Sequence, residues 1–176
     1  ELKRAFLEFI RRGHGFVVVH AAGTMFASWP EYHRLIGATW GPDTGHGRVH
    51  EFEVRMTDLN HPITRGLDAF RLTDELWHRM EVNGPRQILA TAFSAQESGG
   101  SGQDEPVAFV TRLDKGRCFN LVLGHDVKAM SSEGFASLLL RGTEWAATGQ
   151  VNDNSAKPDA APRMDQLLQA VAAYNY

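Results

Sequence analysis

The sequence contains few of the residues that build disulfides, nucleic-acid surfaces or membrane spans. It has one cysteine, Cys118, in 176 residues, which excludes an internal disulfide and a cysteine-based zinc site. Basic residues are slightly outnumbered by acidic ones, the formal charge is −3, and no basic cluster indicates a nucleic-acid partner. No run of 18 apolar residues indicates a membrane span. We therefore expect neither nucleic acid nor membrane as a partner.

The sequence also lacks an initiator methionine and opens inside a helical pattern. Its apolar residues recur at positions i, i+3, i+4, i+7 and i+8, and no helix start signal precedes them. These residues are Leu2, Ala5, Phe6, Phe9 and Ile10. We therefore expect upstream structure, and any signal peptide with it, to be missing. The sequence therefore does not decide whether the protein is cytoplasmic or exported.

What is present suffices for one globular core, since 43% of the residues are apolar. Periodicity predicts helices over 1–12, 30–36 and 133–147, and strands over 15–20, 48–56, 86–92, 106–111 and 117–123. Segments 37–47 and 94–105 read as loops, and 70–82 as short extended pieces. The apolar strand 15–20 suits a parallel strand covered on both faces. This order predicts a three-layer α/β domain with a mixed sheet.

Composition divides the chain into three parts. We predict one α/β domain over residues 1–148. Residues 149–162 are polar and rich in proline and alanine, which indicates a linker. Residues 163–176 are predicted to contain a last amphipathic helix.

Two predicted strands lead into histidines. GFVVVHAAG places His20 after one apolar strand, and CFNLVLGHD places His125 after another. Ligands in open α/β sheets bind beyond the carboxyl ends of the strands. The repeated pattern favours one shared site, whereas either histidine alone is more typical of a hydrogen-bonded structural residue.

Other polar residues are candidates to join these histidines. His46 and His50 are four apart in GHGRVH, but the glycines and the alternation predict a strand rather than a metal-binding helix. His50 shares a strand face with Phe52, so it belongs either to the site or to the core. Asp74 and Glu75 are adjacent in TDELWH, so on a strand only one of them enters the site easily. Such a carboxylate orients an imidazole, acts as a general base or binds a metal, unless the pair is simply solvated.

The remaining candidate site residues could instead be ordinary core, turn or surface residues. Trp29, Tyr32 and Trp40 follow the first histidine strand and either form a wall for stacking sugars or serve as core and lid residues. His14, His33 and His61 read as surface or turn residues. Cys118 lies inside the strand-like run RCFNLVL and reads as a core residue rather than a nucleophile.

Together these motifs resemble the trehalose-utilisation (ThuA-like) family. The resemblance covers roughly residues 1–148 and rests on ordered motifs: GFVVVHAAG, WPEYHRLIGA, GHGRVHEFEVRMTDLNHPITRGL, TDELW, PVAFVTRLDKGRCFNLVLGHD and LLLRGTEWAA. It implies a flavodoxin-like α/β sandwich of the class I glutamine amidotransferase-like type. About the first third of that domain, including its first strands, would be missing here.

The resemblance also implies a chemistry. In class I glutamine amidotransferases the strand like GFVVVH ends in a cysteine nucleophile at a sharp elbow, and a later strand supplies a histidine. His20 stands where that cysteine would be, and His125 resembles the later histidine. An imidazole is not a thiolate, so amide hydrolysis through a thioester is not expected. The family is linked to catabolism of trehalose and related disaccharides through 3-keto-sugar intermediates.

We therefore expect an enzyme of trehalose, disaccharide or keto-sugar catabolism. His20, Glu75 and His125 are its predicted catalytic residues. Its predicted metal ligands are His20, His50 and His125, for a divalent ion such as zinc or manganese. The residues predicted to bind the carbohydrate substrate are Trp29, Tyr32, His46, Asp74 and Asp126.

Two other functions remain open alongside this one. The chain could be a hydrolase of another small molecule, or a non-catalytic module that binds sugars or a partner. Loss of the first strands would leave an unpaired sheet edge. We therefore expect that the isolated 176-residue chain forms homo-oligomers such as dimers, that it aggregates, or that it was cut from a longer ordered chain.

Overall fold

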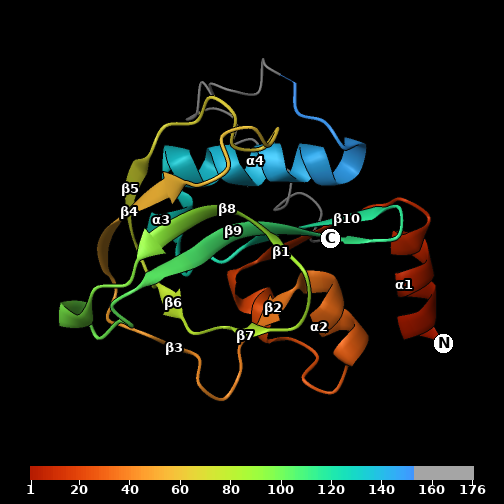
Figure 1. The fold of residues 1–176 in the computed structure, drawn as a ribbon, viewed down its shortest axis with the longest axis horizontal. Coiled ribbons are helices and arrows are strands. Elements are labelled where there is room, and N and C mark those ends of the chain that lie inside the picture. Colours follow the sequence, from red (N-terminus) through yellow and green to blue (C-terminus); the bar gives the residue numbers. More distant parts are fainter. Residues whose placement is uncertain (153–176) are drawn as a thin grey trace, which may run out of the picture.

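The computed structural model describes residues 1–152, which form a six-stranded mixed sheet between two layers of helices (Figure 1). The strands run in the order β1-β10-β9-β8-β4-β5 across this sheet. Their bounds are β1 Gly15–Val19, β4 His50–Met56, β5 Phe70–Asp74, β8 Gln87–Phe93, β9 Asp104–Leu113 and β10 Gly116–Leu121. The helices are α1 Leu2–Arg11, α2 Pro30–Ile36, α3 Val127–Met130 and α4 Glu133–Thr148, with 3-10 turns η1 His20–Thr24 and η2 Gln96–Ser98.

The pairing of β1 with β10 sets the position of the site. These two strands are parallel, with Val19 opposite Leu121, so both carboxyl ends reach the same edge of the sheet. The other neighbours in the sheet pair antiparallel. β9 and β10 form a hairpin, whose turn is made by Asp114 at φ +52° and Lys115. The sheet is therefore mixed, as predicted.

Each face of the sheet has its own core. On one face α4 buries Phe135, Leu138 and Trp145 with Phe119 and Leu121 of the sheet. On the other face α1 and α2 bury a second cluster, which consists of Leu7, Ile10, Val18, Trp29, Tyr32, Leu35, Ile36 and Cys118. Figure 1 shows α4 above the sheet and α2 below it, so the three-layer prediction is confirmed.

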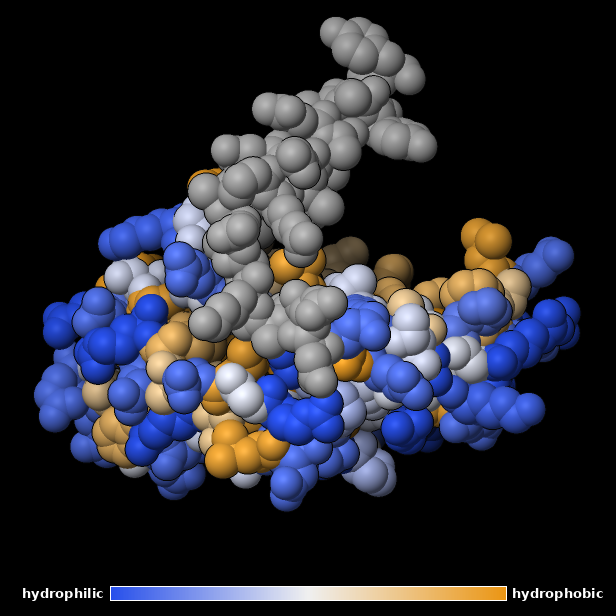
Figure 2. Space-filling model, turned by 90° about the horizontal axis from the view of Figure 1, so that it is seen from above, coloured by the Kyte–Doolittle hydropathy of each residue, from blue (hydrophilic) through white to orange (hydrophobic). Residues whose placement is uncertain are grey.

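Cys118 lies at the centre of this second cluster and is fully buried. Burial raises the pKa of its thiol to about 12, which keeps it protonated near neutral pH. Its interpretation as a core residue is confirmed. Seen from the α4 side, the surface is mostly hydrophilic with scattered apolar residues (Figure 2).

Four short strands form two small ribbons beside the sheet. β2 Ala38–Thr39 pairs with β7 Glu81–Val82, and β3 Gly45–His46 pairs with β6 Trp77–His78. The predicted loop 37–47 therefore contains β2 and β3, which two-residue strands are too short to reveal by periodicity. These ribbons bring segments 37–47 and 75–82 next to each other.

Two features complete the description. Within residues 1–152, no helix is both long and apolar enough to cross a membrane. The predicted C-terminal helix, and the linker from residue 153 onward, lie outside the described residues.

Candidate functional site

The first strand ends in a sharp turn at His20. Val19 is extended, whereas His20 has φ +41°, a left-handed conformation that is rare for a residue with a side chain. The chain then continues into η1. Strained residues of this kind concentrate at functional sites, where the surrounding structure holds them in place. The turn lies at the edge of the sheet where both β1 and β10 end.

Hydrogen bonding fixes the tautomer of His20. Its Nδ1–H donates to the carbonyl oxygen of Val122 at 2.7 Å. Because that nitrogen holds the proton in a neutral ring, the lone pair is on Nε2. The ring is buried and packs on the indole of Trp77, with ring centres 4.6 Å apart. Nε2 therefore faces the rest of the site as an acceptor or a metal ligand.

His125 reaches the same place through a glycine turn rather than directly at the end of its strand. β10 ends at Leu121, and Gly124 has φ +106°, which residues with a side chain rarely adopt. A Cβ at Gly124 would also lie 2.8 Å from the Phe135 ring. The glycine therefore allows the chain to turn beside Phe135 of α4. After this turn, His125 Nδ1 lies 3.3 Å from His20 Nε2.

Glu75 completes the group from a third segment. Its Oε1 accepts a hydrogen bond from Trp77 Nε1 at 2.7 Å, and its Oε2 lies 3.0 Å from His125 Nδ1. The nearest approach to His20 Nε2 is 3.9 Å. One ligand atom from each of His20, Glu75 and His125 falls within 4.8 Å of the other two, and we call these three residues the triad. The structure thus brings together the three residues predicted as catalytic.

Asp74 holds the backbone of two residues of the triad through hydrogen bonds. Its side chain is 1% exposed and accepts three backbone hydrogen bonds, from Glu75 N and His125 N at Oδ1 and from Gly124 N at Oδ2. One carboxylate therefore ties the segment of Glu75 to the segment of His125. Predicted as a substrate-binding residue, Asp74 faces the backbone rather than a cavity.

His46 is a partly exposed residue next to Glu75 of the triad. The β3–β6 ribbon places it opposite Trp77, and its Nδ1 lies 3.9 Å from Glu75 Oε2. Nδ1–H donates to the carbonyl of Gly47 at 2.7 Å, so Nε2 carries the lone pair in the neutral ring. The side chain is 45% exposed. His46 is thus a group of the site that solvent and a substrate can reach.

Aromatic side chains line the same side of the site. The Trp77 ring packs between His20 and Trp40, and the rings of Trp77 and Trp40 meet edge to face at 4.8 Å. Trp40 is half-exposed and lies 6.1 Å from the His46 ring. Of the three aromatic residues proposed as a stacking wall, Trp40 is therefore the one beside the site.

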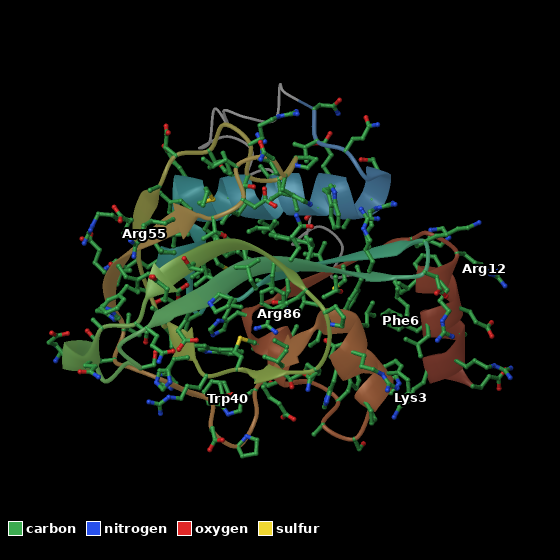
Figure 3. All side chains as sticks on the ribbon, viewed as in Figure 1. Lys3, Phe6, Arg12, Trp40, Arg55 and Arg86 are labelled. Atoms are coloured by element: carbon green, nitrogen blue, oxygen red, sulfur yellow. The ribbon has the colours of Figure 1, made fainter. Side chains whose placement is uncertain are left out.

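Three predicted residues have other partners. Trp29 and Tyr32 are buried in the cluster between α1, α2 and the sheet, where the Tyr32 hydroxyl donates to the Ala22 carbonyl. In Figure 3 Phe6, which packs on Trp29, lies to the right of Trp40, on the side of α1. Asp126 caps α3 by accepting from Ala129 N at 2.8 Å. These side chains serve local structure, and the structure does not place them with the triad.

His50 also stays outside the triad. In the part of the chain that the structure describes, the group that could hold a metal contains His20, Glu75 and His125. His50 begins β4, its Nδ1–H donates to the Arg48 carbonyl at 2.9 Å, and its ring lies 5.4 Å from that of Phe52. The shared strand face with Phe52 therefore reflects packing, and His50 is not among the grouped donors.

Sequence reasoning missed Trp77 and the supporting role of Asp74. Trp77 follows Glu75 by two residues in TDELWH, which is the spacing of side chains on one face of an extended segment. That spacing could have indicated the hydrogen bond between them. Two of the three contacts of Asp74 are with Gly124 and His125, 50 and 51 positions away, so no local pattern reports them.

The donor set of the triad fits a divalent metal ion. Two imidazoles and one carboxylate are a set that zinc, manganese and iron(II) accept. The Nδ1–H of His20 donates a hydrogen bond to the Val122 carbonyl. Metal-ligating histidines typically make such a hydrogen bond through the ring nitrogen that does not bind the metal. Asp74 ties the segments of Glu75 and His125 together, and the Val122 carbonyl holds His20.

The fold and this strand-edge site define an α/β protein of the flavodoxin-like type. The sequence model of the trehalose utilisation (ThuA) family matches residues 1–146, and the chain belongs to that family. None of the curated proteins matches the sequence.

Solved structures agree with this assignment. A ThuA-like protein from Parabacteroides merdae is 37% identical, with a TM-score of 0.82 over 86% of this chain and 66% of its own. A ThuA-like protein from Bacteroides uniformis is 17% identical, with a TM-score of 0.65 over 84% and 65%. A cytoplasmic protein from Salmonella typhimurium is 10% identical at a TM-score of 0.57, covering 82% and 59%. The last two show the fold alone. This chain thus spans just under two thirds of the first relative's length.

Proposed function

We propose that the chain is an enzyme of carbohydrate catabolism that acts on a keto-sugar, with the triad as a divalent metal centre for zinc or manganese. The observation that carries this is the convergence of His20 Nε2, Glu75 and His125 Nδ1 within 4.8 Å. A bound ion would supply a Lewis acid for a carbonyl oxygen. Family membership and the trehalose utilisation of its name support a sugar as substrate.

The side chains around the triad suit proton abstraction next to a ketone. A ketone acidifies the hydrogens on its neighbouring carbons, so isomerisation or elimination needs one base and one electrophile. The His46 side chain is 45% exposed and its Nδ1–H donates to the Gly47 carbonyl, so in the neutral ring its Nε2 would take that proton. Glu75 Oε2, 3.9 Å from His46 Nδ1, would stabilise the imidazolium that forms.

Solvent exchange tests this proposal. The metal-loaded chain is incubated with 3-ketotrehalose or 3-ketoglucose in D2O, and loss of the proton signals beside the ketone is followed by NMR. We expect exchange well above the buffer rate. His46→Gln should lower it roughly 100-fold or more without loss of the ion, since general bases contribute about 10²–10⁴-fold.

Two further variants make the result specific. Glu75→Gln should lose both the ion and the exchange. His14→Gln, whose ring stacks on Phe9 beside α1, should behave as wild type. Absence of exchange in the metal-loaded wild type would overturn the proposal and favour a sugar-binding module. Exchange that is unchanged in His46→Gln would remove His46 from the chemistry.

A further inference from the structure

A pocket is lined in part by Trp40, whose ring packs on Trp77 beside the triad. It encloses about 240 Å³ and is lined by residues of η1, the loop after it, and the β2–β7 ribbon. Its lining includes Thr24, Ala27, Thr39, Trp40, Gly41 and Glu81. It contains none of the triad. The chemistry at the triad does not need this pocket, so its shape calls for another explanation.

The pocket is joined to the triad by continuous packing. His20 begins η1 and Thr24 ends it, so the two are separated by about 8 Å along the axis at roughly 2 Å per residue. Trp40 N donates to the Gly23 carbonyl at 3.2 Å, which fixes the tryptophan against η1. A Cβ at Gly23 would lie 3.3 Å from Trp77, so this glycine allows Trp77 to pack closely.

Trp40 therefore borders both spaces. The Trp40 ring lies near the rings of Trp77 and His46, and Trp40 also lines the pocket. In Figure 3 it lies below the sheet, on the side away from α4. A half-exposed indole between two sites is a platform on which the apolar face of a sugar ring can stack.

The polar groups of the pocket favour a neutral, hydroxyl-rich ligand. The β2–β7 pairing sets Glu81 opposite Thr39, and a Cβ at Gly41 would lie 2.8 Å from Glu81 Oε2. A carboxylate accepts hydrogen bonds from sugar hydroxyls and repels a phosphate. The Thr24 hydroxyl donates a hydrogen bond to the Ala21 carbonyl, so its oxygen can accept a hydrogen bond from a ligand.

We propose that this pocket is the second saccharide subsite of the enzyme and that Trp40 is the platform that positions the outer ring of a disaccharide. The inference rests on the proposed function for the position of the reacting ring. The pocket would hold the unreacted ring while the keto ring lies at the triad.

Binding is measured first, since it does not depend on turnover. Trehalose and glucose are titrated separately into the purified chain by calorimetry. We expect trehalose to bind at least tenfold more tightly than glucose. Ala27→Phe, which fills the pocket without removing a polar group, should weaken trehalose binding to the level of glucose. Ala147→Phe on the exposed face of α4 is the matched control and should bind as wild type.

Exchange kinetics supply the second arm. Ala27→Phe should raise KM for 3-ketotrehalose at least tenfold and leave kcat/KM for 3-ketoglucose within twofold. Trp40→Ala should also raise KM for 3-ketotrehalose at least tenfold. Equal binding of trehalose and glucose, or no effect of Ala27→Phe on trehalose, would overturn the subsite even if keto-sugar exchange is observed. Selective trehalose binding that Ala27→Phe abolishes would uphold it even if no exchange occurs.

Discussion

The individual residues of the site are held mainly by backbone contacts. The His20 ring is set by the Val122 carbonyl, and Asp74 holds the backbone of both Glu75 and His125. Sequence reasoning identified the triad because two histidines follow strands that share a sheet edge. It assigned Glu75 to catalysis and Asp74 to substrate binding, but it could not show that Asp74 holds the backbone, since adjacent residues on an ideal strand face opposite ways, whereas β5 ends between them.

Asp74 is expected to act as a positioning residue. Asp74→Asn places an amide NH2 against backbone N–H groups, so we expect a loss of about 1–3 kcal/mol in unfolding free energy. We also expect a roughly 10- to 100-fold weaker divalent ion affinity, because the backbone of Glu75 and His125 loses its anchor. Denaturant unfolding and calorimetric metal titration measure the two effects.

The control for this variant is Asp104→Asn, which removes one carboxylate of an exposed ion pair with Arg55. It should change stability by no more than about 1 kcal/mol and leave metal affinity unchanged. Wild-type metal affinity in Asp74→Asn would show that Asp74 does not position the site.

His61 is expected to make stability depend on pH. It lies in the predicted turn but is buried against Trp145, and its Nδ1 accepts from Ile63 N. Burial, with a smaller contribution from Arg112, lowers its pKa, and Asp58 opposes this. Because the folded pKa is below the unfolded value, this stability is complete above pH of about 6.5 and is lost as the pH falls toward the folded pKa.

His61→Asn keeps an acceptor near Ile63 N but cannot be protonated. Unfolding measured between pH 7.5 and 5.5 should therefore have a shallower pH dependence in the variant. The difference in slope should approach but not exceed about 1.4 kcal/mol per pH unit. Parallel curves for the two proteins would contradict this role.

At the scale of elements, long periodic segments were predicted and short ribbons were not. The helices and the main strands follow from apolar periodicity. The β2–β7 and β3–β6 ribbons have two residues in each strand and depend on pairing between distant segments. Since they carry His46 and Glu81 into place, the accessible side of the site could not be derived from the sequence.

The packing of α4 on β10 gives a prediction at this scale. A Cβ at Gly142 would overlap the ring of Phe119, so the helix lies this close to the sheet only with glycine there. We expect Gly142→Ala to cost about 1–3 kcal/mol by overpacking, although alanine favours a helix by about 1 kcal/mol. Thr143→Ala, next to it on the exposed side, should stay within about 0.5 kcal/mol. A Gly142→Ala variant as stable as wild type in urea would refute this packing argument.

At the scale of the whole molecule, β1 forms one edge of the sheet in the described residues. Its other side presents backbone groups that a further strand can pair with. The expectation of homo-oligomers therefore stands as a prediction for the 176-residue chain. Sedimentation velocity should show dimers or larger species at micromolar concentration. A single monomeric species across that range would contradict it.

The metal content of the purified chain tests the central claim most directly. The protein is prepared without chelator and analysed for zinc and manganese, beside a His20→Ala/His125→Ala variant and His50→Ala. We predict about one ion per chain in the wild type and in His50→Ala, and none in the double variant. An ion-free wild type that also binds no added zinc or manganese would contradict the account. Glu75 and His125 would then be left as a proton-transfer pair.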